Sequence, residues 1–341
     1  MNKDKAIITW LASGCILIFL MVVIGGITRL TGSGLSITEW KVITGTLPPL
    51  SEEAWQEEFN NYKKIPQYQL LNSDFQLSDF KAIYFWEYIH RLIGRMIGIV
   101  FLIPFIYFWM KKRISKELMP RLYIMFLLGA LQGVIGWYMV SSGLTQNVRV
   151  SHYRLALHLG TAFITFGYIF YVMLQESGKY KRSINKEKNN FPLVILLLVF
   201  IQIILGAFVA GTHAGYVYNT WPDMEGEWVP SSIPFAFEKN GWTSLFDNLA
   251  TVQFVHRCMA YVVTVVILFW WWKQRNSISD ERKRIVNLLL SVLFVQVILG
   301  IYTLLAHVPV WMGVTHQAMA FVLFASAIWQ YYIYQTKVSS S

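Results

Sequence analysis

Cysteine and charge are scarce in this chain of 341 residues. There are only two cysteines, Cys15 and Cys258, and charged residues make up 14% of the sequence. Both cysteines lie in apolar runs, and the acidic loops contain none. The sequence therefore excludes a disulfide framework or a thiolate metal site in those loops, and we interpret both cysteines as small buried hydrophobic residues.

Hydrophobic residues, by contrast, make up 55% of the chain, and its mean hydropathy is +0.44. A soluble protein of this length would need far more polar surface. Uncharged apolar runs are long enough to cross a hydrocarbon core of roughly 30 Å. We predict eight transmembrane helices, near residues 7–30, 83–109, 119–140, 152–175, 191–211, 250–273, 285–306 and 312–335.

The chain has a net charge of +10, and its charged residues are distributed unevenly among the loops between these spans. Lysine and arginine fill the loops around residues 111–121, 179–188 and 273–284, whereas the loops around 39–79 and 223–247 are acidic. This alternation is the positive-inside pattern, so we expect cytoplasmic N- and C-termini and no nucleic-acid partner. The N-terminus has neither a cleavable signal pattern nor a transit peptide, which favours a bacterial cell inner membrane.

The second half of the sequence repeats the first in units of four spans. The matching segments are Tyr88–Arg91 with Phe254–Arg257, Gln132–Gly136 with Gln296–Gly300, His158–Phe163 with His316–Phe321 and, more weakly, Ile24–Ile27 with Leu205–Phe208. Because four is even, both copies face the same way across the membrane. We therefore predict an all-α membrane protein of two parallel-repeat four-helix bundles, residues 1–175 and 191–341, joined by a cytoplasmic linker at 176–190. The loop at 31–82 is larger than its counterpart at 212–249, and Glu52–Tyr62 within it has a helical pattern.

Four histidines fall at matching places in these repeats: His90, His158, His256 and His316. All four lie on spans that run from outside to inside, and a rise of about 1.5 Å per residue places them roughly 6–11 Å below the outer surface. A lone histidine in a membrane is more often a packing residue. Four histidines at one depth and at repeat-equivalent positions favour a role as metal ligands. Ligation satisfies an imidazole nitrogen that would otherwise be unpaired.

Two pairs of histidines on facing helices suit a planar macrocycle, so we predict two haem irons. Zinc would normally also take a carboxylate or thiol, and no nearby Cys or Met pattern indicates copper. Arg91 and Arg257, each next to a candidate ligand, are candidates for pairing with haem propionates, with snorkelling to the interface as the alternative. His152, His213 and His307 lie at span ends, where interface residence explains them.

The two halves differ at one ionisable position. Glu87 lies three residues before His90 on the same helical face, and the second half has Gln253 there. A carboxylate at the membrane edge is a functional candidate, and it gives only this half an acid or base beside the predicted macrocycle. An ion pair with Arg91 or Arg154, made for packing, is the alternative.

At these residues the chain resembles the haem A synthase family, in the branch whose outer loop lacks cysteine. The resemblance extends over nearly the whole chain. The segments that carry it are Gly25–Thr31, Ser33–Ser36, Glu87–Arg95, Leu131–Trp137, Met139–Gly143, Val150–Leu155, His213–Gly215, Asn219–Pro222, His256–Arg257 and His316–Gln317. No one of these segments suffices alone, but their order and spacing together are specific.

The resemblance implies oxidation of a porphyrin methyl group of haem O to a formyl group, which gives the haem A of terminal oxidases. It further implies that His90 and His158 hold the substrate haem O, and that His256 and His316 hold a haem b that carries electrons. A haem O synthase and oxidase assembly factors are the partners expected from the family, in a lipid bilayer. The sequence leaves the oligomeric state open, a homo-oligomer included.

Two other functions compete with this interpretation. A dihaem cytochrome b, passing electrons from a quinol to an outer acceptor, would have two similar haem sites and no modified haem. A transporter built from parallel repeats would show broken helices and polar residues at the midplane. The polar groups of this chain instead cluster toward one membrane face, and Glu87 and the large first loop count against the plain cytochrome.

Overall fold

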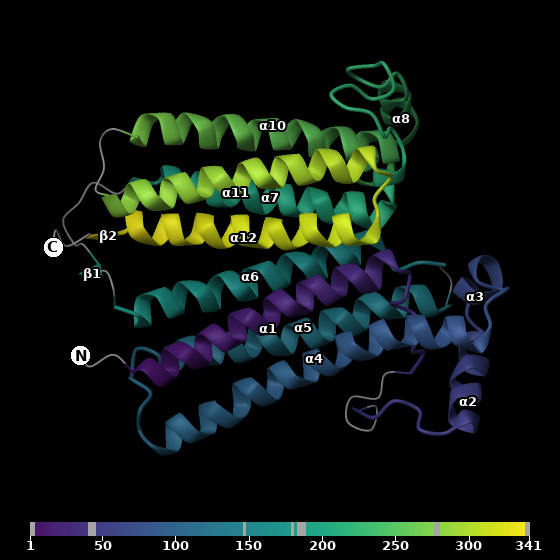
Figure 1. Cartoon of the computed structure of the whole chain (residues 1–341), viewed down its shortest axis with the longest axis horizontal. Coiled ribbons are helices and arrows are strands. Elements are labelled where there is room, and N and C mark those ends of the chain that lie inside the picture. The colour runs from purple at the N-terminus through teal and green to yellow at the C-terminus, as the bar shows by residue number, and fades with distance from the viewer. Residues whose placement is uncertain are drawn as a thin grey trace. The chain divides into compact units, whose positions relative to one another are not determined.

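Eight long α-helices make up most of the protein (Figure 1). The computed structural model describes residues 4–39, 46–145, 148–178, 181–182, 189–275 and 280–337. The helices long and apolar enough to cross a membrane are α1 (Lys5–Leu30), α4 (Leu77–Met110), α5 (Met119–Thr145), α6 (His152–Glu176), α7 (Phe191–Thr212), α10 (Leu249–Gln274), α11 (Asp280–Leu305) and α12 (Val310–Tyr334). The prediction of an all-α membrane protein with eight spans is confirmed.

The chain divides into two compact units. The His90 unit comprises Ile16–Ala162, and the His256 unit comprises Met1–Cys15 with Phe163–Ser341. The boundary between the units falls within α1, after Cys15, and within α6, after Ala162. The two functional halves proposed from the repeat, with a linker at 176–190, stay a prediction, and residues 179–180 and 183–188 of that linker lie outside the described residues.

Helix α4 begins earlier than the sequence predicts. Seven of the long helices begin and end within five residues of the predicted spans, but α4 starts at Leu77 rather than near residue 83. Gln76 and Asp79 form a reciprocal capping box that fixes this start. The added turns contain the charged residues Asp79 and Lys81, which lower their hydropathy. They are helical nevertheless, and Phe80 within them packs against the first long connection.

The first long connection, residues 31–76, is anchored at the end of α1. Gly32 has a φ of +68°, which L-residues with side chains rarely adopt. Its N–H donates to the carbonyl of Arg29, and the N–H of Ser33 donates to that of Thr28, which is the Schellman arrangement. The side chain of Gln67 also donates to the carbonyl of Gly32.

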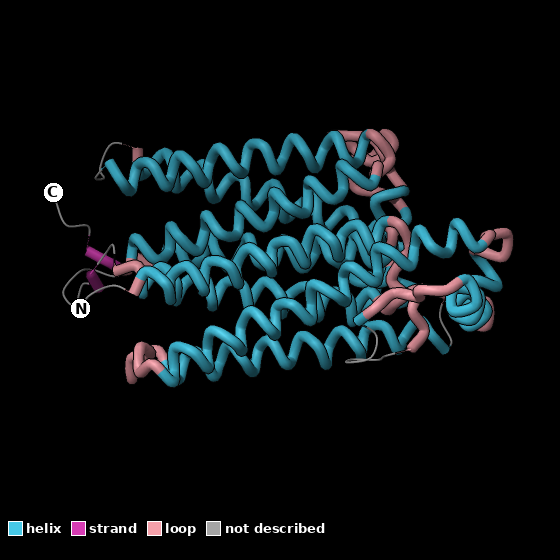
Figure 2. The backbone as a smooth tube through the Cα atoms, turned by 60° about the horizontal axis from the view of Figure 1, so that its bottom comes forward, coloured by secondary structure: helices cyan, strands magenta, loops and turns pink. Residues whose placement is uncertain are grey.

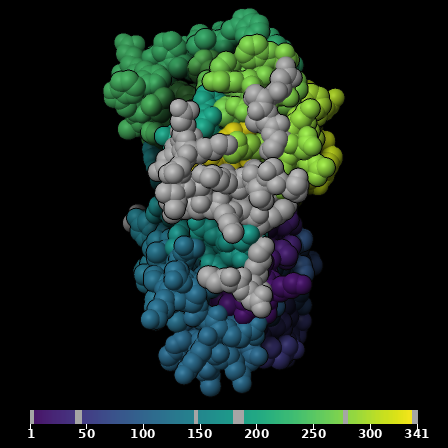
Figure 3. All heavy atoms as spheres, turned by 90° about the vertical axis from the view of Figure 1, so that its left-hand side faces the viewer, coloured from purple at the N-terminus to yellow at the C-terminus, as the bar shows by residue number. Residues whose placement is uncertain are grey.

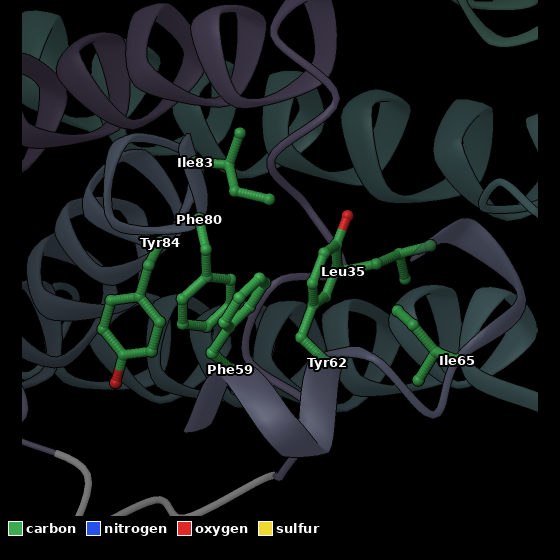
Figure 4. Packing of buried hydrophobic residues seen from close by; sticks show 7 residues of the cluster. All are labelled: Leu35, Phe59, Tyr62, Ile65, Phe80, Ile83 and Tyr84. Atoms are coloured by element: carbon green, nitrogen blue, oxygen red, sulfur yellow. The ribbon is translucent and has the colours of Figure 1, made fainter. Parts of the chain in front are cut away.

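Two helices of this connection, α2 (Glu52–Tyr62) and α3 (Pro66–Leu71), form a cap with the start of α4. The helix expected at Glu52–Tyr62 is confirmed, with Ser51 as its N-cap. Figure 4 shows the buried cluster that holds the cap: Leu35, Phe59, Tyr62, Ile65, Phe80, Ile83 and Tyr84. The rings of Phe59 and Phe80 stack with centroids 5.1 Å apart.

In the His256 unit, α7, α10, α11 and α12 pack against one another. The second long connection, residues 213–248, contains η2 (Ala214–Tyr216), α8 (Ser232–Asn240), η3 (Gly241–Thr243) and α9 (Ser244–Asp247). Figure 2 shows the irregular segments of each unit, in pink, at the ends of its long helices. Two-residue strands, β1 (Lys181–Arg182) and β2 (Thr336–Lys337), pair antiparallel beyond α6 and α12.

The turn between α4 and α5 carries basic residues, as the charge pattern requires. Lys111, Lys112 and Arg113 are exposed there, and the blue spheres of Figure 3 include this turn. Which side of the membrane it faces stays a prediction from the positive-inside pattern.

Candidate functional site

The four candidate ligands lie on four different helices, two in each unit. His90 projects from α4 and His158 from α6 in the His90 unit, whereas His256 projects from α10 and His316 from α12 in the His256 unit. All four side chains are half-buried. Within each unit the two imidazoles are close enough to interact electrostatically. The structure thus brings together the pairs that the repeat predicts.

Three of the four imidazoles have a ring nitrogen without a partner among the described residues. The Nδ1 atoms of His90, His158 and His316 are buried and make no hydrogen bond within the described part of the chain. An unpaired polar atom in an apolar interior costs free energy, and ligation of a metal is one way to satisfy an imidazole. Paired imidazoles with available nitrogens, on separate helices of an apolar bundle, fit axial ligands of haem.

A site for a bare metal ion is not present in the described residues. No three His, Cys, Asp or Glu side chains come together there. Zinc and other bare transition metals usually need at least three protein ligands. Two histidines per unit therefore agree with a macrocycle that supplies the other ligands itself.

Glu87 is buried, with 3% of its surface exposed, and hydrogen-bond donors surround it. Its Oε2 accepts from the Oγ of Ser36 at 2.7 Å and from the backbone N–H of Ile37 at 2.9 Å. Its Oε1 accepts from the Nη2 and Nε of Arg91, at 2.7 and 3.1 Å. These donors stabilise the charged carboxylate, and they attach the first long connection to α4.

Arg91 completes this attachment. Its Nη1 donates to the carbonyl of Glu39 and its Nη2 to that of Ile37, both at 2.8 Å. The ion pair considered for Glu87 is therefore made with Arg91. The alternative partner, Arg154, instead donates to the carbonyl of Tyr138 at 2.6 Å and lies over that ring.

In the His256 unit, Gln253 and Arg257 likewise attach the second long connection to α10. Here the side chain at the position of Glu87 donates to the connection instead of accepting from it. The Nε2 of Gln253 donates to the carbonyls of Ala214 and Val217, and its Oε1 accepts from Arg257 at 2.9 Å. Arg257 also donates to the carbonyls of Tyr218 and, through Nη1, Asp223. Its Nε is buried without a partner among the described residues, so one donor is available for an anionic group.

The three remaining histidines lie at helix ends, as the sequence suggests. His213 and His307 have left-handed backbone, with φ of 63° and 60°, where α7 and α11 end. The N–H of His307 donates to Leu304, and the next residue, Val308, donates to Thr303. His152 is the first residue of α6. None of the three lies beside the candidate ligands in sequence.

Glutamines beside the imidazoles are a feature that the sequence reasoning missed. The Nε2 of Gln202 on α7 lies 3.2 Å from the Nδ1 of His256, and that of Gln296 on α11 lies 3.4 Å from the Nε2 of His316. The available signal was the spacing to glycine, because Gln202 and Gln296 each precede a glycine by four residues.

Comparison with known proteins extends over almost the entire chain. A family model described as COX15-CtaA, cytochrome oxidase assembly protein, matches residues 8–328. A protein of Flavobacterium psychrophilum named "Heme A synthase" is 48% identical over 331 residues, which cover 96% of this chain and 97% of that protein. A protein of the same name from Parvibaculum lavamentivorans is 46% identical over 328 residues, covering 96% of this chain and 94% of its own length.

These matches span both histidine pairs, both long connections and all eight long helices at least in large part. The chain therefore belongs to the COX15-CtaA family of cytochrome oxidase assembly proteins.

Proposed function

We propose that this protein is a haem A synthase, an oxidoreductase that converts haem O to haem A in a bacterial cell inner membrane. The observation that carries the proposal is the pair of imidazoles in each of two units, three of which have a buried Nδ1 that makes no hydrogen bond among the described residues. Relatives that share the name "Heme A synthase" and 46–48% identity support it.

The two pairs take different haems in this proposal. His90 and His158 hold the substrate haem O, and His256 and His316 hold a haem b. When bound, the haem b supplies a one-electron carrier between the substrate and an external acceptor. The unpaired Nε of Arg257 suits a propionate of the haem b. The guanidinium of Arg91 already binds Glu87 and two carbonyls, so a propionate contact of Arg91 stays a prediction.

The substrate reaction occurs at the ring edge, which axial histidines leave accessible. Removal of two electrons and a proton from the methyl group, with addition of water and loss of a second proton, gives an alcohol. A second such oxidation gives the hydrated aldehyde, and loss of water leaves the formyl group. The conjugated ring delocalises the charge that develops at the carbon during each oxidation.

Glu87 is the residue to which we assign a part in this chemistry. It is three residues from His90, and the His256 unit has an uncharged amide in its place. In this proposal the carboxylate accepts a proton or stabilises the cationic carbon. The donors around it support the charge that either task requires.

The first experiment is extraction of haem from the full-length protein, purified after co-expression with a haem O synthase. Chromatography and mass analysis would identify each haem. Haem A or its hydroxylated intermediate beside haem B supports the proposal. Haem B alone, at two per chain while haem O is available, would instead favour the dihaem cytochrome b.

Substitutions separate the two sites. We expect His256→Ala to keep the substrate haem and lose haem b, and unchanged haem b content would overturn this assignment. We expect Glu87→Gln to keep both haems and to form little haem A. Ser36→Ala is the matched control, because it removes a donor from Glu87 and keeps the carboxylate. Haem A formation at the normal rate by Glu87→Gln would show that the carboxylate takes no part.

The transporter alternative is not supported by the helices. Each of the eight spans is one continuous α-helix over the residues that the structure describes, without the breaks expected of a midplane substrate site. Contacts with a haem O synthase and oxidase assembly factors, a homo-oligomer, and cytoplasmic termini stay predictions.

A further inference from the structure

Each candidate haem ligand faces a glycine on the preceding long helix, which is α1, α5, α7 or α11. A methyl carbon added to any of these glycines would contact the imidazole edge, with Cε1 the nearest atom in every case. The distances from that carbon to Cε1 are 3.1 Å for Gly25 and His90, 3.3 Å for Gly136 and His158, 3.2 Å for Gly206 and His256, and 2.8 Å for Gly300 and His316.

Other glycines on the same helices have different surroundings. Gly14 on α1, and Gly129 and Gly133 on α5, have nothing within 4 Å of an added methyl carbon. Gly133 is three residues from Gly136 on the same helix, yet only Gly136 lies against a histidine. A general preference for small residues in membrane helices does not explain why the same ring edge meets a glycine four times.

A second residue accompanies each glycine, four positions earlier and therefore on the same helix face. The four segments are Met21–Gly25, Gln132–Gly136, Gln202–Gly206 and Gln296–Gly300. Three of them share the pattern Gln-x-x-x-Gly, and the exception lies on α1.

In the His256 unit both glutamines reach the imidazoles. The amide of Gln202 lies 3.2 Å from the Nδ1 of His256 and also donates to the His256 carbonyl at 3.1 Å. The amide of Gln296 lies 3.4 Å from His316. The Oε1 atoms of both glutamines are buried without partners in the described structure. Rotation of the Gln296 amide by 180° presents its oxygen as an acceptor for an imidazole N–H, the usual support of a metal-bound histidine, whereas Gln202 holds His256 through the bond that it donates to the His256 carbonyl.

In the His90 unit neither imidazole has this support. Met21 cannot donate or accept a comparable bond. Gln132 donates instead to the hydroxyl of Thr161, at 2.6 Å. The two units thus share the glycine contact but differ in the amide contact.

We propose that Gly25, Gly136, Gly206 and Gly300 are positioning residues that seat the four imidazoles, and that Gln202 and Gln296 additionally hold the pair in the His256 unit. This inference rests on the proposed role of the four histidines as haem ligands. Each glycine lets the ring lie edge-on against a neighbouring helix, which limits its rotation about the side-chain bonds. The amides fix the His256 and His316 rings further, which suits a haem that stays bound, whereas the unheld rings suit a substrate that is exchanged.

The test compares Gly300→Ala and Gly206→Ala with Gly14→Ala and Gly133→Ala in the full-length, haem-loaded protein. Three quantities are measured: haem b per chain, the rate of haem transfer to excess apomyoglobin, and the electron paramagnetic resonance spectrum of the low-spin ferric haem. The spectrum reports how the axial imidazoles are oriented, so it does not depend on activity. Thermal unfolding of each variant reports whether the fold is kept.

We expect Gly300→Ala to accelerate haem b loss about 5- to 150-fold, the range of typical overpacking effects. It should also shift the resonance of the haem that remains. Gly206→Ala should produce a smaller change, because its 3.2 Å contact needs a shift of only a few tenths of an ångström. Gly14→Ala and Gly133→Ala should match the unsubstituted protein, since an alanine there meets open space.

The inference is overturned if Gly300→Ala and Gly206→Ala retain haem b with unchanged resonance while His316→Ala loses it. If His256→Ala and His316→Ala both keep haem b, the proposed ligands are wrong, and the positioning role of the glycines is wrong as well. Should Gly300→Ala fail to fold, the milder Gly206→Ala decides the outcome.

The glutamine contact has its own matched pair of variants. Gln202→Leu removes the amide beside His256, whereas Gln132→Leu removes an amide that bonds Thr161 instead. We expect a shifted resonance and faster haem b loss in Gln202→Leu alone. Equal effects of the two substitutions, or none from Gln202→Leu, would overturn this part.

Discussion

Arg91→Ala removes the cation that attaches the first long connection to α4. In the structure its guanidinium makes two bonds to Glu87 and one each to the carbonyls of Ile37 and Glu39. After the substitution Glu87 retains only the donors of Ser36 and Ile37. We expect the segment 31–39 to open from α4 much more often than it does in the unsubstituted protein.

The magnitude follows from the burial of the pair. The side chains of Arg91 and Glu87 are 11% and 4% exposed, so solvent screens their attraction only weakly. Breaking a buried pair by removing one partner typically costs about 3–5 kcal/mol. The two remaining donors to Glu87 offset part of this, so we use the lower bound. A loss of about 3 kcal/mol changes an opening equilibrium roughly 150-fold.

Hydrogen–deuterium exchange measures this opening directly, because the backbone N–H of Ile37 donates to Glu87. Mass spectrometry of peptides covering residues 31–39 should show exchange faster by about two orders of magnitude in Arg91→Ala. Peptides from α7 and α11 should be unchanged, since they belong to the other unit.

Lys81→Ala is the control for loss of a positive charge on the same helix. Its ion pair with Glu52 is exposed, with side chains 37% and 69% accessible, and an exposed pair contributes about 0.2–1 kcal/mol. Exchange of residues 31–39 in Arg91→Ala equal to that in Lys81→Ala would refute the reasoning, because the buried bonds would then carry no more free energy than a surface pair.

Two further predictions concern the cap. Gly143→Ala on α5 should lower the free energy of unfolding by about 1–3 kcal/mol, because its methyl carbon would lie 2.7 Å from a Cδ of buried Leu35; Gly133→Ala should leave thermal unfolding unchanged. Tyr62 accepts from Asn72 and donates to Gln67, so Tyr62→Phe should cost about 1 kcal/mol near neutral pH. Burial raises the pKa of Tyr62 from 10.0 to about 12, so the neutral form is favoured on folding. Its contribution should therefore be complete below pH 10 and decline between pH 10 and about pH 12; a stability difference from Tyr62→Phe that grows with pH would contradict this.

The sequence was sufficient for the spans and for the pairing of the histidines. Both can be read from the sequence, as apolar runs of bilayer length and as a repeat in which His90 aligns with His256 and His158 with His316. The start of α4 was not predictable in this way. Asp79 and Lys81 lower the hydropathy of its first turns, and only packing of Phe80 against the cap shows why they are helical.

The surroundings of Glu87 were also beyond the sequence. Position and charge singled the residue out, but its partners Ser36 and Ile37 are about fifty residues away and meet it only through the turn at the end of α1. The contact between Gln202 and His256 could have been found, because Gln202 repeats the position of Gln296 before a glycine. Hydropathy does not reveal it, since one glutamine in an apolar helix looks like any tolerated polar residue.

Glu87 accepts hydrogen bonds from its long connection and Gln253 donates them to its own, and this difference bears on the role of the carboxylate. Both residues hold an arginine and a long connection, so anchoring by itself does not require a charge. Each is nevertheless matched to its neighbours: Glu87 accepts from the Ile37 N–H, whereas Gln253 donates to two carbonyls. An amide at position 87 would direct N–H groups at existing donors unless it turned its oxygen toward them and released Arg91. Loss of haem A in Glu87→Gln is therefore informative only beside Ser36→Ala and the exchange of residues 31–39, which separate a loosened connection from a missing charge.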